Sequence, residues 1–600
     1  MQRRTSGVAS LLFGMALIAG CSGGGSSESK ETTAKDTTAT TASATTATTA
    51  AATTATTASG GKGSSDGGGG GGGSAAPMET APLTAGYGFE VPKHGFPFEN
   101  YGNSQGYSNL TAAEVQRMFG DAACAKGSGP TCTLTPPAEA WMKQQNEGMN
   151  GGHCEGMAVV ALLLQQGKID ASKLGGASAA AMPIQGNEAL QREIAYWFVT
   201  QSLQPTQNQS FKAAPVDIVA KLREWFAAGS AADTYTVGFY KRGFKDGHAV
   251  TAVGLGDKPG GNVDILVYDN NYPNQVRAIS VDMKANTWVY SGSPNPAQAE
   301  GRYEGDAESK TLEVTPTSAR LQQQVCPFCG EATTAAAEAK GRATGRTTNQ
   351  SSGQLGSGSK GSALAAPTQV FLDAAAYEAG VTFKVQAVGG GTLAGVTEIH
   401  PRGGEDLWDK DTPPILQVPA GTAFQVVIDA TAVKAAIETD VAIVAPGLSG
   451  GISGISMSPG QRDTLVVEPA RKAMKYTTSS DESPTMYFGV DGEPDNYEFS
   501  LGGVELGKSG GTLEGRLDTT AKKLIARTTG SDTATILFYL ERINDDADES
   551  LENDGVQLKP NETLVVEYGS WKGNKSSVTA GIDTNGDDAI DTPLEIEDEK

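Results

Sequence analysis

Three polar residues in the first half of the chain have the types and the order that nucleophilic catalysis requires. Cys154 follows a glycine-rich stretch, His248 begins one strand-like run and Asp269 ends the next. A thiol, an imidazole that takes its proton and an acceptor that orients the imidazole can together attack a carbonyl carbon. Asn270 and Asn271 compete with Asp269 for the third role, because a neutral amide can also orient an imidazole.

The surroundings of Cys154 would activate a thiol. The glycines before Cys154 disfavour a helix, whereas Met157–Leu164 is apolar on nearly every side, as in a buried helix. Cys154 is therefore expected at a helix N-terminus, where unpaired amides and the helix dipole stabilise a thiolate. We expect a largely ionised thiol, paired with the His248 imidazolium near neutral pH.

The elements around these residues predict how they could meet. The expected order is a helix over 214–228 and strands over 234–240, 247–254, 263–268, 276–281 and 287–290. Short strands in sequence with turns between them are typical of an antiparallel meander. A cysteine at the start of a helix, a histidine at the head of one strand and an aspartate after the next would converge where the helix meets the sheet.

The order Cys154, Gly-His248-Ala-Val and Asp269 resembles the papain-like cysteine peptidase superfamily, nearest to the bacterial type that processes double-glycine leaders. The resemblance covers residues from about 110 to 300. It implies a domain over 77–330 in which a helix packs on an antiparallel sheet. It also implies that Cys154 is the nucleophile, that His248 is the general base and later acid, and that Asp269 orients the imidazole.

The chain departs from this family at the oxyanion donor. The family places a glutamine about six residues before the cysteine, but position 148 is glycine, and Gln145 is the nearby amide expected to replace it. Without this donor the rate should fall by roughly 10²–10³-fold, and a degenerate, inactive domain is the alternative. Gly-His-Cys154-Glu-Gly-Met-Ala also resembles the cysteine helix of transglutaminase-like domains, which makes acyl transfer a second enzymatic hypothesis.

The chain has six cysteines, at positions 21, 124, 132, 154, 326 and 329. An exported protein tends to oxidise its paired cysteines. Cys124 with Cys132 and Cys326 with Cys329 are close enough in sequence to pair locally, although four cysteines allow three pairings. Zinc at Cys326-Pro-Phe-Cys329 is disfavoured because no second cysteine pair supplies the missing ligands. Redox chemistry is disfavoured because the motif does not follow a strand of a βαβ unit, so a structural disulfide is expected.

The first 76 residues predict export and anchoring. Arg3 and Arg4 precede a short apolar run that ends at Ile18-Ala-Gly-Cys21, which resembles the lipobox of bacterial lipoproteins. The resemblance implies a signal peptide over 1–20, a lipidated Cys21 and a membrane partner. Residues 21–76 are rich in Thr, Ala, Ser and Gly and predict a disordered tether. Ser22 favours an outer-membrane or cell-surface location in the bacterial envelope.

The C-terminal part has a different pattern. Residues 331–366 predict a linker, and short Val-, Thr- and aromatic-rich runs follow over 367–470 and 471–600, so we expect one or two β-sandwich-like domains. The whole chain is thus predicted to be α+β. Near the C-terminus, Asp583, Asn585 and Asp587 resemble positions 1, 3 and 5 of an EF-hand or dockerin calcium loop, so calcium is a possible but not a required cofactor.

The net charge of −23 argues against nucleic-acid binding, which needs clustered Lys and Arg. The sequence favours a membrane-anchored, extracytoplasmic cysteine peptidase that acts on peptides or proteins. The alternative is a surface binding or structural lipoprotein whose papain-like domain is inert.

Overall fold

The computed structural model describes most of the chain beyond residue 77. The described residues are 78–228, 233–292, 301–330, 366–403, 412–492, 494–507, 510–529, 533–574 and 576–598. All of them belong to the unit Gly71–Lys600. The predicted signal peptide, Cys21 and the tether lie outside the described residues, as does the predicted linker apart from Ala366.

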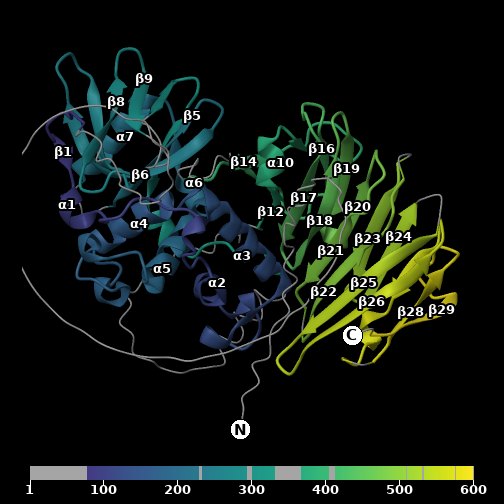
Figure 1. The fold of residues 1–600 in the computed structure, drawn as a ribbon. Coiled ribbons are helices and arrows are strands. Elements are labelled where there is room, and N and C mark those ends of the chain that lie inside the picture. The colour runs from purple at the N-terminus through teal and green to yellow at the C-terminus, as the bar shows by residue number, and fades with distance from the viewer. Residues whose placement is uncertain are drawn as a thin grey trace, which may run out of the picture. The chain divides into compact units, whose positions relative to one another are not determined.

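The chain combines helices with several antiparallel sheets, as the sequence predicts (Figure 1). Helices hold 22% and antiparallel sheets 39% of the structure, so the class is mixed α+β. No helix among the described residues is long and apolar enough to cross a lipid bilayer.

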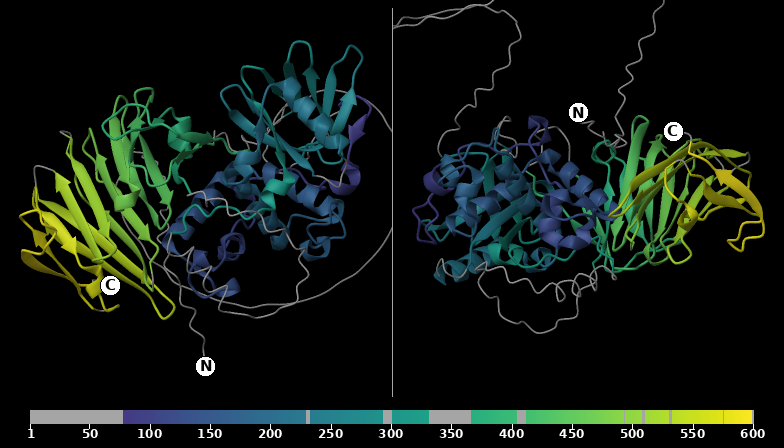
Figure 2. Two further views of the ribbon diagram at one scale, coloured as in Figure 1. Left: turned by 180° about the vertical axis from the view of Figure 1, so that it is seen from behind. Right: turned by 90° about the horizontal axis from the view of Figure 1, so that it is seen from below.

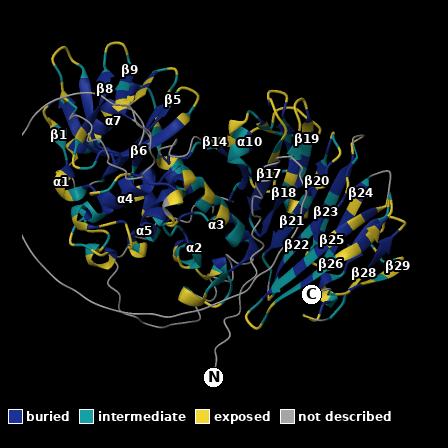
Figure 3. Cartoon of the chain, in the orientation of Figure 1, coloured by how far each residue is buried: buried dark blue, intermediate teal, exposed yellow. Residues whose placement is uncertain are grey.

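Local sequence signals account for the main helices of the N-terminal part. Thr111 and Glu114 form a capping box before α2, and the side chain of Thr135 caps α3. Helix α4 is apolar on almost all sides and is buried from Cys154 to Leu163, as Figure 3 shows. The helices are α1 (Val91–His94), α2 (Ala112–Phe119), α3 (Pro136–Gly148), α4 (Cys154–Gln165), α5 (Glu188–Val199), α6 (Thr206–Gln209), α7 (Pro215–Ala227) and α8 (Thr317–Arg320).

A nine-stranded sheet carries the predicted meander, because β5 to β10 pair with one another in chain order. Helices α4 and α7 pack against this sheet (Figures 1 and 2). Its strands are β1 (Ala85–Gly86), β4 (Phe211–Lys212), β5 (Tyr235–Lys241), β6 (Lys245–Asp257), β7 (Val263–Tyr268), β8 (Val276–Asp282), β9 (Thr287–Gly292), β10 (Gly301–Asp306) and β11 (Leu312–Pro316). A separate hairpin joins β2 (Cys124–Lys126) to β3 (Thr133–Leu134).

The C-terminal part consists of two nine-stranded antiparallel sheets. The first sheet contains β12 (Thr368–Leu372), β14 (Thr397–Ile399), β15 (Ile415–Val418), β17 (Ile437–Ala445), β18 (Leu448–Met457), β21 (Thr485–Val490), β22 (Asn496–Gly502), β25 (Ala534–Ile543) and β26 (Asp548–Leu558). The second contains β13 (Thr382–Gln386), β16 (Phe424–Asp429), β19 (Arg462–Glu468), β20 (Ala473–Thr477), β23 (Thr512–Asp518), β24 (Lys523–Thr529), β27 (Thr563–Val566), β28 (Val578–Asp583) and β29 (Thr592–Ile596). A short helix, α10 (Ala374–Glu378), follows β12.

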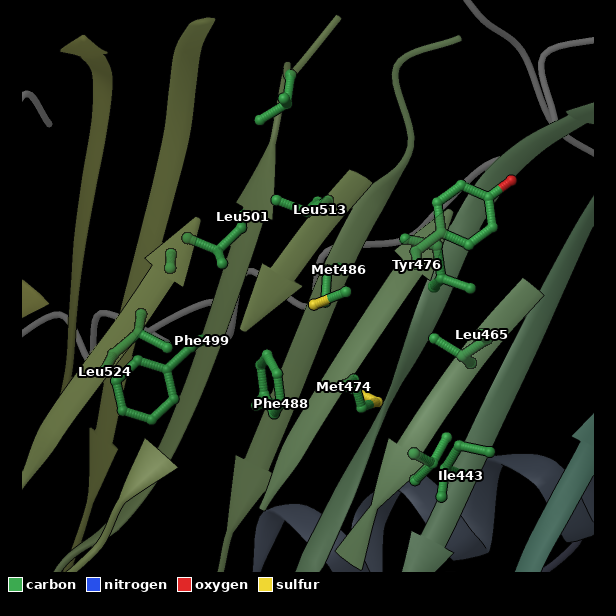
Figure 4. Packing of buried hydrophobic residues seen from close by; sticks show 14 of the residues in the cluster. Ile443, Leu465, Met474, Tyr476, Met486, Phe488, Phe499, Leu501, Leu513 and Leu524 are labelled. Atoms are coloured by element: carbon green, nitrogen blue, oxygen red, sulfur yellow. The ribbon is translucent and has the colours of Figure 1, made fainter. Parts of the chain in front are cut away.

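The two sheets share one hydrophobic core. Side chains from both sheets belong to the same buried cluster, and Figure 4 shows Phe488 of the first sheet near Met474 of the second. Alternating apolar residues place this core between the sheets, since successive side chains of a strand point to opposite faces.

Both C-terminal sheets contain strands from before and after residue 470, where the sequence suggested a boundary between two β-rich regions. Consecutive hairpins alternate between the sheets: β17–β18 and β21–β22 belong to the first sheet, whereas β19–β20 and β23–β24 belong to the second. Strands on the two sides of residue 470 therefore belong to the same pair of sheets.

The helical part and the first C-terminal sheet share a further apolar cluster. It joins Trp141 of α3 and Phe328 to Phe371, Ile399 and Val444 of the sheet. The cluster includes Ile399, the last residue of β14, and residues 400–403 follow directly after it.

Candidate active site

Cys154 is the first residue of α4 and is completely buried. Its sulfur accepts a hydrogen bond from the backbone N–H of Ala249, at 3.3 Å, so the helix start lies directly against β6. The preceding turn ends at Gly152, whose φ of 128° is one that L side chains rarely adopt. The glycine-rich sequence thus allows the sharp entry into the helix that presents the thiol.

His248 and Asp269 form a buried pair beside Cys154. The imidazole Nε2 lies 2.9 Å from Oδ1 of Asp269. The pairing of β6 with β7 explains this contact: Thr251 lies opposite Tyr268, so the residue three positions before Thr251 meets the turn that follows Tyr268. The hydroxyl of Tyr290 donates to the other oxygen of Asp269 and fixes the carboxylate.

The neighbouring amides have other partners. The side chain of Asn270 donates to the backbone carbonyls of Cys154, at 3.0 Å, and Ala249, at 3.1 Å, and so ties α4 to β6. The backbone N–H of Asn271 donates to Asp269 at 2.8 Å. Of the three candidates for orienting the imidazole, Asp269 is therefore the one in contact with His248.

Charge and burial set the protonation of the Cys154–His248–Asp269 group. Burial opposes the charged imidazolium, but the charge of Asp269 and, once the thiol is ionised, that of Cys154 outweigh it and raise the pKa of His248 to about 10. Burial also opposes the carboxylate, yet the charge of His248 and hydrogen bonds lower the pKa of Asp269. With Nε2 directed at Asp269, Nδ1 of His248 is the ring nitrogen left to exchange a proton with the thiol.

The thiol itself differs from the sequence expectation. Burial raises the pKa of Cys154 above its ordinary value, and the neighbouring charge of His248 only partly offsets this effect. The expected thiolate near neutral pH is therefore wrong for this closed arrangement, because dehydration of the sulfur outweighs the charge and hydrogen bonding that favour the thiolate. In agreement with a neutral thiol, Sγ donates to the backbone carbonyl of Arg402 at 3.3 Å.

Residues His400–Gly403, here called the covering segment, lie over Cys154. The backbone N–H of Arg402 donates to Gln201 at 2.7 Å. The carbonyl oxygen of Gly403 accepts from the side-chain amide of Asn100, at 2.9 Å, and from the backbone N–H of Cys154, at a longer 3.4 Å. Two donors therefore converge on one peptide carbonyl beside the thiol.

This arrangement gives Asn100 the position that the sequence assigned to Gln145. Gln145 is buried on α3, where its side-chain oxygen accepts from Ser202 at 3.3 Å. The amide of Asn100 has a fixed orientation, because its oxygen accepts from the backbone N–H of His153 at 2.8 Å and leaves the nitrogen facing Gly403. No sequence motif marks Asn100, which lies in a loop before η1 (Asn103–Gln105).

His153 is a buried residue that directly precedes α4. Its ring contacts the carbonyl of Tyr101 at 2.6 Å and the side chain of Asn109 at 2.8 Å. Burial lowers the pKa of His153 to about 4, so the ring is neutral at physiological pH. It holds the loop that carries Asn100.

A buried charge cluster anchors the covering segment. Glu155, the residue after Cys154, forms ion pairs with Arg320 and, at 2.5 Å, with Arg402. Arg402 also pairs with Glu313 of β11. All four side chains are buried, so each charge is balanced within the cluster rather than by solvent.

The remaining cysteines form the two local disulfides. Cys124 pairs with Cys132 across the β2–β3 hairpin, and Cys326 pairs with Cys329 beside the cluster that contains Phe328. Cys154 is the free cysteine of the described residues. This pairing is one of the three that the sequence allowed.

The predicted calcium loop connects β28 to β29. The oxygens of Asp583, Asn585 and Asp587 accept hydrogen bonds from backbone amides of the same loop, and Asp588 pairs with Arg516. No group of three or more metal-binding side chains is found in the part of the chain that the structure describes. Calcium at this loop stays a prediction.

Comparison with protein-family models, curated proteins and solved structures found no match for this chain. The contacts around Cys154 are therefore the basis for a functional proposal.

Proposed function

We propose that the chain is a cysteine peptidase, with Cys154 as nucleophile, His248 as general base and acid, and Asp269 as the group that orients the imidazole. The observation that carries this proposal is the convergence of the thiol, the buried His248–Asp269 pair and two donors on one peptide carbonyl. The similarity of the Cys154, His248 and Asp269 motifs to papain-like peptidases points to the same chemistry. Its substrates would be peptides or proteins, and it would require no cofactor.

Each residue has a defined task in this proposal. Nδ1 of His248 accepts the thiol proton, and the thiolate attacks the carbonyl carbon of the bound peptide. The backbone N–H of Cys154 and the side chain of Asn100 stabilise the oxyanion that forms. His248 then protonates the leaving amine, while Asp269 keeps the ring oriented and its positive charge balanced.

The function is tested by hydrolysis of a mixture of fluorogenic peptides by the full-length chain. Cys154→Ala and His248→Ala are each expected to lower the rate by about 10⁴-fold or more, because triad members act as a unit. His94→Ala is the matched control, since His94 lies on α1 and its ring accepts a hydrogen bond from the backbone N–H of Glu90 at the start of that helix. Equal rates for Cys154→Ala and the unmodified protein would exclude this peptidase.

The pH dependence of alkylation tests the coupling within the site. Because burial raises the pKa of Cys154, iodoacetamide should label the folded chain slowly at pH 7 and faster as the pH becomes alkaline. The charge of His248 lowers the pKa of the thiol, so His248→Ala should move this rise to higher pH. Mass spectrometry of the labelled peptide gives the profile, and an unchanged profile in His248→Ala would contradict the coupling.

We also propose that the protein is lipid-anchored at Cys21 in a bacterial cell envelope. The motif lies outside the described residues, so the support comes from the sequence alone. Cys21→Ser should move the protein from the membrane fraction to the soluble or unprocessed fraction, as measured by immunoblotting of fractionated cells. Retention of a processed Cys21→Ser protein in the membrane would contradict lipid anchoring.

A non-catalytic envelope protein is the second candidate. It is favoured by the complete burial of Cys154 beneath the covering segment and by the large pair of C-terminal sheets. In that case neither peptide hydrolysis nor the coupled alkylation profile would be observed, whereas both are expected for the peptidase.

A further inference from the structure

The peptide occupying the candidate site belongs to the chain itself. We propose that the protein cleaves its own backbone on the carboxyl side of Gly403, which makes the covering segment His400–Gly403 its first substrate. This inference rests on the proposed peptidase function and adds the bond that is cut.

The donors around the covering segment select this bond. Two neighbouring carbonyls lie near Cys154, but only that of Gly403 accepts both the Cys154 backbone N–H and the Asn100 amide. The carbonyl of Arg402 instead accepts the thiol, 3.3 Å from Sγ. Since donors stabilise the carbonyl that becomes an oxyanion, the carbonyl carbon of Gly403 is the one prepared for attack.

The surrounding residues are shaped to hold the segment in this place. A Cβ at Gly152 would collide with the carbonyl oxygen of Gly403, and a Cβ at Gly247 would lie 2.7 Å from that of Pro401. These glycines therefore permit a close approach that other residues would prevent. The carboxylates of Glu155 and Glu313 balance the positive charge of Arg402. The site therefore favours a segment with an arginine before the glycine over a segment with an uncharged residue there.

The reaction consumes one water molecule and needs no other reactant. The proton of Cys154 passes to Nδ1 of His248, and the sulfur forms a bond to the carbonyl carbon of Gly403. The bond from that carbon to the following nitrogen then breaks, and this nitrogen receives the proton from His248. Water hydrolyses the thioester, which restores the thiol and leaves a carboxylate on Gly403.

The two fragments should remain associated after cleavage. Strands β12, β13 and β14 precede the cut, whereas their partners β15, β16 and β17 follow it. Both disulfides lie within the N-terminal fragment, so no disulfide among the described cysteines links the two products. The products should therefore separate on a denaturing gel but elute together from a native sizing column.

The experiment follows purified full-length protein over time, with intact-mass measurement of the products. We expect one fragment that ends at Gly403 and one that begins at Gly404, with no cleavage in Cys154→Ala. Gly403→Leu should also stay intact, because a Cβ there meets the backbone of Gly151 and Gly152 at 3.2 Å. The thiol of Gly403→Leu should nevertheless react with iodoacetamide, which shows that the variant retains its nucleophile.

A synthetic peptide that copies residues 398–408 separates failure of this inference from failure of the proposed function. A chain that stays intact while it hydrolyses this peptide in a Cys154-dependent way would overturn self-cleavage and leave the peptidase in place. A cut at any other bond, including the one after Arg402, would overturn the assignment to Gly403. If the chain and the peptide stay uncut while the fluorogenic mixture is hydrolysed, self-cleavage alone is overturned; if all three stay uncut, both proposals fail.

Discussion

Asn100→Ala is expected to slow Cys154-dependent cleavage by about 10²–10³-fold, the usual effect of removing one oxyanion donor. The side chain of Asn100 lies 2.9 Å from the carbonyl oxygen of Gly403, whereas the Cys154 backbone N–H is farther away at 3.4 Å. The side-chain amide is thus the better placed of the two donors. The rate is measured as the first-order appearance of the N-terminal fragment, or as hydrolysis of the matching peptide.

Two further variants separate the donor from its structural role. Asn100→Asp keeps an oxygen for the backbone N–H of His153 but loses the donor, so it should be at least as slow as Asn100→Ala. Gln145→Ala should retain most of the rate, because Gln145 contacts Ser202 rather than the covering segment. A large loss in Gln145→Ala with none in Asn100→Ala would reverse this assignment.

Glu155→Gln is expected to lower the free energy of unfolding by about 3–5 kcal/mol, as is typical when one partner of a buried ion pair is removed. The substitution keeps the size of the side chain but leaves the positive charges of Arg320 and Arg402 without their shared carboxylate. Denaturant unfolding followed by circular dichroism gives the change, provided that it is measured on the uncleaved Cys154→Ala background.

Glu304→Gln is the matched control for this prediction. Glu304 pairs with Arg302 at the surface, where 55% and 68% of the two side chains are exposed, so the loss should be small. Similar losses in the two variants would mean that the buried cluster does not stabilise the fold.

The local part of the candidate site could be predicted from the sequence, because each signal lies within a few residues. The change from glycines to an apolar helix indicated the position of Cys154, and two adjacent strand-like runs indicated those of His248, inside β6, and Asp269, directly after β7. The choice between Asp269 and the following asparagines needed the turn geometry. That turn directs the side chain of Asn270 to two backbone carbonyls. Secondary-structure propensities of residues do not predict the direction of a side chain in a turn.

The long-range part could not be predicted. Asn100 precedes Cys154 by two helices and a hairpin, and the covering segment follows it in another part of the chain. The sequence expectation of an ionised thiol failed for the same reason, since the dehydration that raises the pKa of Cys154 comes from contacts such as that with Arg402. The pairing of strands from both sides of residue 470 in the same two sheets could not be predicted either. These strands resemble one another in composition, so composition does not indicate which of them pair.

The alternation of hairpins between the two C-terminal sheets has a consequence for aggregation. Each sheet has two edge strands with one partner among the described residues, β14 and β26 in the first sheet and β13 and β29 in the second. An open strand edge can recruit another chain unless charges or proline block it. Strand β26 carries Asp548, Glu549, Glu552 and Asp554, and β29 carries Pro593 and Glu595. The acidity of the C-terminal region thus falls on two of the four sheet edges, β26 and β29, where it opposes intermolecular strand addition.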